Sequence, residues 1–200
     1  MIIGAGFSGI CMGIKLKKLG VPFQILEREG GVGGTWLKNT YPGCACDIPV
    51  HCYSFSFEPQ STWSNYFASQ REILEYLEQC AKKHDILPHI HFHQKVTSTQ
   101  WCEDGVWRIF TSKGQEFVAS VLVSAIGVFQ EPVIPKLQGF ESYKGSWFHS
   151  SNWNHDVELE GKRVAVVGTS ASGNESNQPT NSHLCLWPAL CKNVSYIHTN

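Results

Sequence analysis

The stretch Ile2-Ile3-Gly4-Ala5-Gly6-Phe7-Ser8-Gly9 joins the end of an apolar strand to the glycine pattern G-x-G-x-x-G. The residues behind it predict an amphipathic helix that ends at Gly20, with isoleucines and leucines on one side and lysines on the other. Residues 22–27 then predict a second strand, which closes on the acidic residue Glu27. This order of strand, turn, helix and strand is typical of a dinucleotide-binding unit.

Each residue of this glycine turn has a physical role at a dinucleotide. Gly4 allows the tight turn, Gly6 lets the backbone approach a pyrophosphate, and Gly9 lets helix and strand pack closely. The helix N-terminus offers N–H groups and its positive dipole end to the phosphates. Glu27 can accept hydrogen bonds from ribose hydroxyls, and an acid there disfavours a 2′-phosphate. FAD or NAD is therefore favoured over NADP at this first site.

The composition is that of a globular chain with one sizeable core, or one domain and part of another. Its 200 residues are 42% hydrophobic and 16% charged, with a formal net charge of −1. This charge gives no reason to expect a nucleic acid or an anionic membrane surface as partner. No apolar run approaches the ~20 residues that a membrane span needs. The chain enters a strand at once, so we expect no signal peptide.

The eight cysteines are scattered along the chain. Without a secretion signal, reduced thiols in a cytoplasmic protein are expected. Cys44, Cys46, His51 and Cys52 lie close together in the sequence, but they contain no C-x-x-C pair and no second ligand pair follows at finger-like spacing. We therefore expect no metal site.

The middle of the chain predicts a mixture of loop, helix and antiparallel strands. Residues 30–36 are too rich in glycine for a regular element. In residues 53–57, aromatic and serine side chains alternate with a period of two, as in a half-buried strand. Ser69 and Glu72 form a capping box that opens a helix with one apolar face. Three strand-like runs follow at residues 90–101, 106–111 and 116–126, which predicts an inserted β-meander. The last run ends in a nearly continuous apolar stretch, so it should return to the main sheet beside the first strand.

A second glycine turn follows a linker marked by Pro132, Pro135 and Gly139. Residues 161–168 predict an apolar strand that runs into the turn Gly168-Thr169-Ser170-Ala171-Ser172-Gly173. Ser170 stands where the middle glycine of the pattern should be, and its Cβ would crowd the approach of a pyrophosphate.

These motifs together resemble the Baeyer–Villiger monooxygenases, within the wider flavin-containing monooxygenases. The stretches at residues 44–49 and 54–59 resemble fungal members of the family most. Tyr143-x-Gly145-x-x-x-His149-x-x-x-Trp153 is similar to the family fingerprint F-x-G-x-x-x-H-x-x-x-W, with Tyr in place of Phe. The run from Gly33 to Asp47 is similar to the family's flavin-facing loop. The resemblance extends from the first residue to about Gly173.

The resemblance implies an α/β fold with three parts. Residues 1–140 would form a Rossmann-like FAD-binding domain with the inserted β-meander, residues 141–160 the fingerprint linker, and residues 161–200 an incomplete Rossmann-like NADP domain. It also implies the residues that bind the cofactors FAD and NADP(H), which are Gly4, Gly6, Gly9, Glu27, Gly34, Thr35, Trp36, Asp47, Tyr53, Val96, Gly168, Thr169 and Ser170.

The reaction that the resemblance implies uses FAD, NADPH and O₂ to insert one oxygen atom next to the carbonyl of a small-molecule ketone. Asp47 would be the catalytic residue, orienting an arginine or the nicotinamide amide near the flavin. His149 is expected to link the two domains by a hydrogen bond rather than carry a proton. A structural role for His149 and Trp153 stays open as an equal alternative.

The sequence after Gly173 departs from the family pattern. Residues 174–182 should form a helix, yet they are polar and interrupted by Pro179, and family-like sequence resumes at Pro188-Ala189-Leu190 and at a strand over residues 194–198. The arginine for an NADPH 2′-phosphate and the family's catalytic arginine are absent. We therefore expect a truncated or mis-spliced product, with residues 175–187 as translated intron.

Two other functions stay open. The chain could be a non-catalytic FAD-binding fragment, and for the chain as given we expect weak or no retention of FAD and no oxygenation. It could also be another flavoprotein with two dinucleotide sites, such as an N-hydroxylating monooxygenase or a disulfide-type reductase. The missing C-x-x-C-like pair and the fingerprint argue against the reductase.

Overall fold

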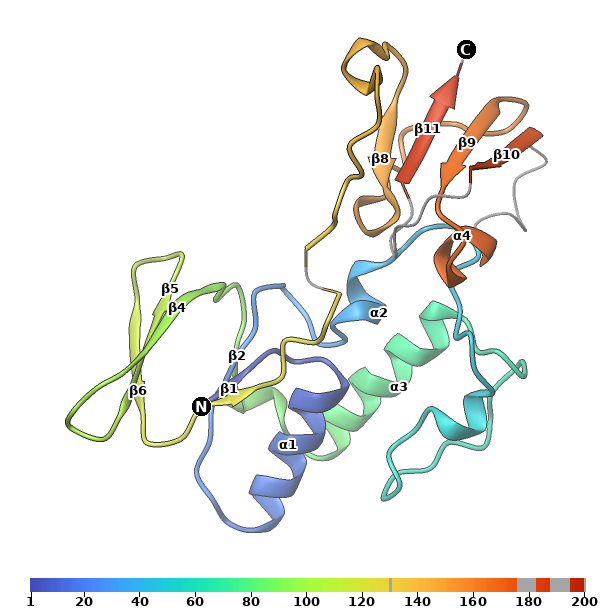
Figure 1. The fold of residues 1–200 in the computed structure, drawn as a ribbon. Coiled ribbons are helices and arrows are strands. Elements are labelled where there is room, and N and C mark those ends of the chain that lie inside the picture. Colours follow the sequence, from blue (N-terminus) through green and yellow to red (C-terminus); the bar gives the residue numbers. More distant parts are fainter. Residues whose placement is uncertain (130, 176–182, 188–194, 200) are drawn as a thin grey trace. The chain divides into compact units, whose positions relative to one another are not determined.

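A computed structural model describes residues 1–129, 131–175, 183–187 and 195–199, which divide into two compact units (Figure 1). The first unit contains residues 1–37, 54–61 and 71–130, and the second contains residues 38–53, 62–70 and 131–200. The domain boundaries expected from the sequence stay a prediction. Residues 176–182 of the supposed intron, and Pro188-Ala189-Leu190, lie outside the described residues.

The first unit is built on a four-stranded parallel sheet with the order β3-β2-β1-β7. Its strands are β1 (Ile2–Ile3), β2 (Ile25–Leu26), β3 (Ile90–His91) and β7 (Val123–Ser124). Helix α1 (Phe7–Lys18) joins β1 to β2 and buries its isoleucines. The predicted α/β fold is confirmed, as is the return of the chain beside the first strand.

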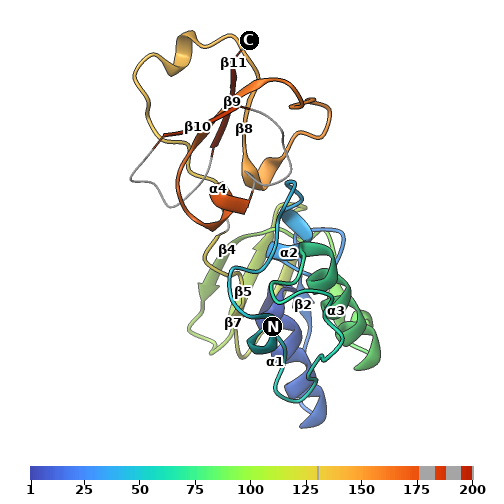
Figure 2. The same cartoon turned by 90° about the vertical axis from the view of Figure 1, so that its right-hand side faces the viewer.

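Helix α3 (Gln70–Lys83) begins directly after the predicted capping-box serine and buries Ile73 and Leu77 completely. Figure 2 shows α1 and α3 next to one another, and the rings of Phe7 and Tyr76 meet between them at a centroid distance of 6.2 Å. The predicted β-meander is confirmed as a separate antiparallel sheet of β4 (Val96–Trp101), β5 (Trp107–Thr111) and β6 (Glu116–Ala119).

Three strand predictions in this unit need correction. Residues 53–57 form no strand, and Phe55 instead makes an isolated antiparallel bridge to Glu58 in a local turn. The run 90–101 is divided into β3 and β4, and His93 between them has a positive φ of 56° that ends an extended backbone. The run 116–126 is divided into β6 and β7, because the chain passes there from the meander to the parallel sheet.

The second unit contains a mixed sheet with the order β10-β9-β11-β8 (Figure 1). Its strands are β8 (Trp147–His149), β9 (Arg163–Val167), β10 (His183–Trp187) and β11 (Ser195–Thr199), and α4 (Ala171–Glu175) follows the second glycine turn. Strands β9 and β11 confirm the strands predicted at 161–168 and 194–198. Strand β10 falls within the supposed intron and was not predicted.

The remaining elements are short. Helix α2 (Thr35–Lys38) begins inside the stretch expected to be irregular. The 3₁₀ turns are η1 (Val50–Cys52), η2 (Leu87–His89), η3 (Phe140–Ser142) and η4 (Ser150–Asn152). In the part of the chain that the structure describes, no helix has the length and apolar character required to cross a membrane.

Candidate cofactor site

Two glycines of the first turn are required by its close packing. Gly4 has a positive φ of 102°, and a Cβ on it would lie 2.6 Å from the carbonyl oxygen of Ala125. A Cβ on Gly9 would lie 1.8 Å from the carbonyl oxygen of Gly4, which no side chain could tolerate. The turn therefore packs against β1 and the end of β7 as the sequence predicts.

Gly6 differs from these two because it has room beside it. Its φ of −82° is ordinary, and the nearest atom to a Cβ would be the Cα of Gly34 at 3.6 Å. Gly34 in turn has a positive φ of 56° and approaches Gly6, while the Gly33 N–H donates to the Ala5 carbonyl over 3.0 Å. The structure thus brings the glycine-rich loop against the first glycine turn and leaves a strip of backbone between them without side chains.

The start of α1 is suited to an anion. Gly6 is its N-cap, no side chain caps the helix, and its first turn contains no acid. The first N–H groups of a helix lack partners within the helix, and the helix dipole makes this end positive. A pyrophosphate lying over Gly6 would meet both features.

Glu27 lies at the same place and is only 5% exposed. Its Oε2 accepts the N–H of Ala5 over 2.6 Å, and its Oε1 accepts the N–H of Glu29 over 2.8 Å. The sequence did not predict these bonds, which fix the carboxylate to the glycine turn. An ionised carboxylate has about four lone-pair positions, so two remain for ribose hydroxyls. The residues present therefore fit an FAD adenosine and pyrophosphate.

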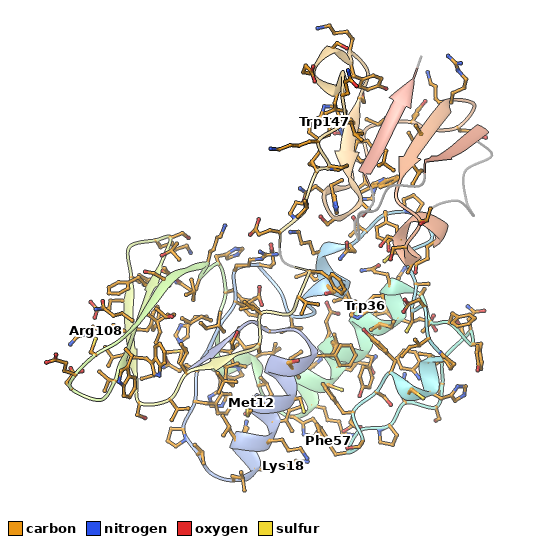
Figure 3. The ribbon with its side chains drawn as sticks, viewed as in Figure 1. Met12, Lys18, Trp36, Phe57, Arg108 and Trp147 are labelled. Atoms are coloured by element: carbon orange, nitrogen blue, oxygen red, sulfur yellow. The ribbon has the colours of Figure 1, made fainter. Side chains whose placement is uncertain are left out.

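Three further predicted residues lie in or next to the first unit's loops. Trp36, labelled in Figure 3, is buried, and its backbone N–H donates to the carbonyl of Gly33. Thr35 is exposed at the start of α2, and Val96 is half-buried at the start of β4. Their contacts with a flavin stay predictions.

Asp47 and Tyr53 belong to the second unit. Asp47 is exposed, in a loop held by the Cys46 N–H, which donates to the Ala68 carbonyl over 2.8 Å. The Tyr53 N–H donates to the Val50 carbonyl at the end of η1. The roles predicted for both residues at the flavin stay untested.

A cluster that sequence reasoning missed lies next to Asp47. The Tyr41 hydroxyl donates to Oε2 of Glu175, on α4, over 2.6 Å. Burial raises the pKa of the Glu175 carboxyl, and Asp47 adds to the rise, against hydrogen bonds from Tyr41 and the Ala45 N–H. Burial also raises the pKa of the Cys44 thiol to about 12, so this cysteine is a neutral thiol. The sequence signal for this cluster was Glu175, an acid in the segment where the family pattern calls for a helix with an apolar face.

The second glycine turn, residues 168–173, forms a turn in the structure although its sequence departs from the G-x-G-x-x-G pattern at Ser170. Gly168 has a positive φ of 124°, and the Ser170 carbonyl accepts the Gly173 N–H over 2.9 Å. Thr169 and Ser170 are exposed. Their contact with NADP, and the crowding expected from Ser170, stay predictions.

The fingerprint residues lie around β8. Gly145 is at the bend before the strand, and His149 ends it with only 7% of its surface exposed. The Trp153 ring packs edge-on against Phe148, with centroids 5.1 Å apart. These positions support a structural contribution by Trp153 to the core of the second unit.

The proton on His149 can be assigned from its hydrogen bonds. Nδ1 accepts the Ser151 N–H over 3.1 Å, so the proton of a neutral ring is on Nε2. Nε2 is buried and has no hydrogen-bond partner among the described residues. Burial, and then the charge of Lys38, lower the pKa of His149, which disfavours a charged ring. A link from His149 to the other domain stays a prediction.

The sequence pattern of the family described as "Pyridine nucleotide-disulphide oxidoreductase" matches residues 1–178. The chain belongs to this family. Among its relatives, a Baeyer–Villiger monooxygenase of Pseudomonas aeruginosa is 44% identical over 173 residues, which cover 86% of this chain and 33% of the relative. An FAD-binding monooxygenase of Aspergillus niger is 35% identical over 211 aligned positions, covering 98% of this chain and 33% of the relative.

This pyridine nucleotide-disulphide oxidoreductase family member also resembles solved structures. The crystal structure of cyclohexanone monooxygenase from Rhodococcus sp. Phi1 bound to NADP⁺ is 35% identical with a TM-score of 0.83, and the match covers 93% of this chain and 37% of that one. The predicted resemblance to Baeyer–Villiger monooxygenases is confirmed. The chain spans about a third of the length of the relatives it matches.

The cysteines show no redox pair or metal ligand set in the described ranges. Six cysteines are free thiols, namely Cys11, Cys44, Cys46, Cys52, Cys80 and Cys102. Among the residues that the structure covers, no group of three or more His, Cys, Asp or Glu side chains could hold a metal ion.

Proposed function

We propose that this chain supplies the FAD-binding part, and the beginning of the NADP-binding part, of an NADPH-dependent flavoprotein monooxygenase of Baeyer–Villiger type. The observation that carries this proposal is the strip of bare backbone at Gly6 and Gly34, with the Glu27 carboxylate fixed beside it. The monooxygenase names of the relatives support the reaction class.

The residues of the first unit would divide the work of binding FAD. The N-terminus of α1 would hold the pyrophosphate over Gly6, and Glu27 would accept hydrogen bonds from the adenosine ribose. When bound, NADPH would supply the hydride and FAD would pass its electrons to O₂, so that one oxygen atom is inserted next to a ketone carbonyl and the other leaves as water. Thr35, Trp36 and Val96 would shield and position the flavin.

The second unit would serve NADPH. Gly168, Thr169 and Ser170 would lie against its pyrophosphate, and Asp47 would orient a group near the reacting flavin ring. The substrates would be a small ketone and O₂. We propose the cytoplasm as the compartment, which the six free thiols support.

Binding of FAD by the 200-residue chain tests the first part of this proposal. We expect saturable quenching of flavin fluorescence with a dissociation constant above about 1 μM, because the relatives supply further contacts from the rest of their length. FMN is the matched control ligand, since it lacks the adenosine and the pyrophosphate, and it should not bind. Equal binding of FMN and FAD, or no binding of FAD, would refute the proposed site.

The selectivity of Glu27 can be tested in the same titration. ADP-ribose should displace FAD more effectively than ADP-ribose carrying a 2′-phosphate, because a phosphate beside the buried carboxylate would be repelled. Equal displacement by the two competitors would count against the ribose role of Glu27.

A chimaera separates a competent FAD-binding part from a vestigial one. In this chimaera, residues 1–173 replace the matching segment of the Pseudomonas aeruginosa relative. The purified protein is incubated with a ketone, NADPH and isotopically labelled O₂, and the product is identified by mass spectrometry. We expect a flavin-containing protein that forms a labelled ester. A folded chimaera that binds no flavin would favour the non-catalytic alternative, whereas a labelled N-oxide from an amine substrate would favour N-hydroxylation.

A further inference from the structure

Residues 55–58 form a tight turn in the first unit, here called the aromatic turn. The Glu58 N–H donates to the Phe55 carbonyl over 3.0 Å, which closes the turn. The hydroxyl of Tyr76, on α3, accepts the Phe55 N–H over 2.8 Å and donates to the Glu58 carbonyl over 2.8 Å. Tyr76 is only 3% exposed, so a single buried hydroxyl bridges both ends of the turn.

The aromatic turn has a second attachment to α3. The Glu58 carboxylate receives a hydrogen bond from Lys83 Nζ at 2.6 Å and lies 3.0 Å from His84 Nε2. These groups are partly exposed, so the Lys83 ion pair and the His84 contact are weaker than the buried bonds of Tyr76. The Tyr76 hydroxyl is therefore the main fixed point of the turn.

The other side of the aromatic turn faces α1. The Phe55 ring meets the Phe7 ring edge-on at 5.3 Å, and the Phe57 ring stacks on Phe55 at 5.1 Å. The ammonium groups of Lys15 and Lys18 lie over the Phe57 ring, 4.5 and 4.9 Å from its centre (Figure 3). The turn thus contacts α1 at its first residue and near its last turn.

We propose that the Tyr76 hydroxyl is a positioning group for the FAD site, acting through Phe55 on Phe7. Phe7 is the first residue of α1 and stands inside the glycine pattern, between Gly6 and Gly9. By fixing the aromatic turn, Tyr76 holds the N-terminus of α1 in the position that receives the pyrophosphate. This inference rests on the proposed binding of FAD at the first glycine turn.

Replacing Tyr76 by Phe removes only the hydroxyl. The ring remains against Phe7 and Phe55, but the Phe55 N–H and the Glu58 carbonyl lose their partner. Buried groups without a hydrogen bond favour opening of the turn, so a smaller fraction of the molecules has α1 in the binding position. We expect the dissociation constant for FAD to rise about tenfold.

The titration compares wild type, Tyr76→Phe and the control Tyr66→Phe, which removes an exposed phenol from the second unit. Phe55→Leu, which removes the ring that contacts Phe7, should weaken FAD binding similarly. The double variant should then be no worse than either single variant, because both act through one path. Ile73→Val supplies a variant of α3 that is destabilised without touching the turn, and it should leave the dissociation constant unchanged.

Hydrogen exchange on the flavin-free protein tests the inference without FAD. The amides of Phe7 to Gly9 should exchange faster in Tyr76→Phe than in wild type and in Ile73→Val. Unchanged exchange and unchanged affinity in Tyr76→Phe, or additive losses in the double variant, would overturn the inference. If wild type itself binds no FAD, the proposed function fails, and the exchange result alone decides the role of Tyr76.

Discussion

Glu27 shows how much of the candidate site depends on one side chain. The sequence places an acid at the end of β2, but the structure adds that its two oxygens already hold the N–H groups of Ala5 and Glu29. A carboxylate can accept both bonds because it presents acceptors only. Glu27 therefore shapes the glycine turn before any ligand is present.

Glu27→Gln should destabilise the chain even without FAD. In the glutamine, one carboxylate oxygen is replaced by an NH₂ group, which cannot accept a hydrogen bond. Either the Ala5 N–H or the Glu29 N–H therefore loses its acceptor. We expect a loss of about 1–3 kcal/mol in the free energy of unfolding, measured by urea denaturation. The partly exposed neighbour Glu29 is the control, since Glu29→Gln weakens a partly exposed ion pair with Arg28 and should cost less than about 1 kcal/mol. Equal effects of the two variants would contradict this account.

At the scale of elements, periodicity and glycine spacing predicted β1, α1, β2 and α3 because those segments follow simple local rules. The strand expected at residues 53–57 failed for a tertiary reason. Its alternation is real, but the Phe55 N–H that a strand would offer to a neighbour is taken by the Tyr76 hydroxyl. No local pattern indicates that a helix side chain will take that bond.

The candidate site was predicted in the same uneven way. Gly4, Gly6, Gly9 and Glu27 meet in one place because they are joined by β1, α1 and β2. The partnership of Tyr41 with Glu175 joins residues far apart in the sequence, and neither residue type signals it alone. The strand β10 was missed because its neighbouring segment did not match the family pattern.

The contact between α4 and the loop at Tyr41 makes a prediction about pH. Because burial raises the pKa of Glu175 above its ordinary value of 4.5, its contribution to stability is complete below that value and is lost as the pH rises through the raised pKa. Glu175→Gln, which resembles the protonated form, should melt about 2 °C above wild type at pH 8 and at the same temperature as wild type at pH 4.

The measurement is thermal unfolding of both proteins across this pH range. Glu160→Gln changes an exposed acid of the same unit and is the control, which should leave the pH dependence of wild type unchanged. A Glu175→Gln variant whose difference from wild type is the same at every pH would show that folding does not raise the pKa of Glu175.

At the scale of the molecule, apolar side chains are exposed around the edge strand β7. Val128 is 87% exposed and Phe129 68%, and Val121 and Ile126 also face solvent. Exposed apolar groups beside a sheet edge favour association. We expect light scattering to show oligomers that grow with concentration, and the double variant Val128→Ser with Phe129→Ser to reduce them strongly. Leu19→Ser, at an isolated exposed leucine, should have no effect, and a wild-type chain that stays monomeric at high concentration would contradict this expectation.

The central claim is that the first glycine turn receives the pyrophosphate of FAD, and Gly6→Ala tests it most directly. A Cβ on Gly6 would lie 3.6 Å from the Cα and 3.9 Å from the nitrogen of Gly34, which are ordinary contacts, and the φ of −82° suits alanine. The melting temperature should therefore stay close to that of wild type, as it should for the control Gly31→Ala, whose Cβ has equally ordinary contacts.

Titration of FAD into wild type, Gly6→Ala and Gly31→Ala is the deciding measurement. The methyl group of Ala at position 6 would occupy the strip where the pyrophosphate should lie, so we predict at least a roughly tenfold loss of affinity in Gly6→Ala alone. If a folded Gly6→Ala variant binds FAD as tightly as wild type does, the pyrophosphate does not lie on this turn and the account is wrong.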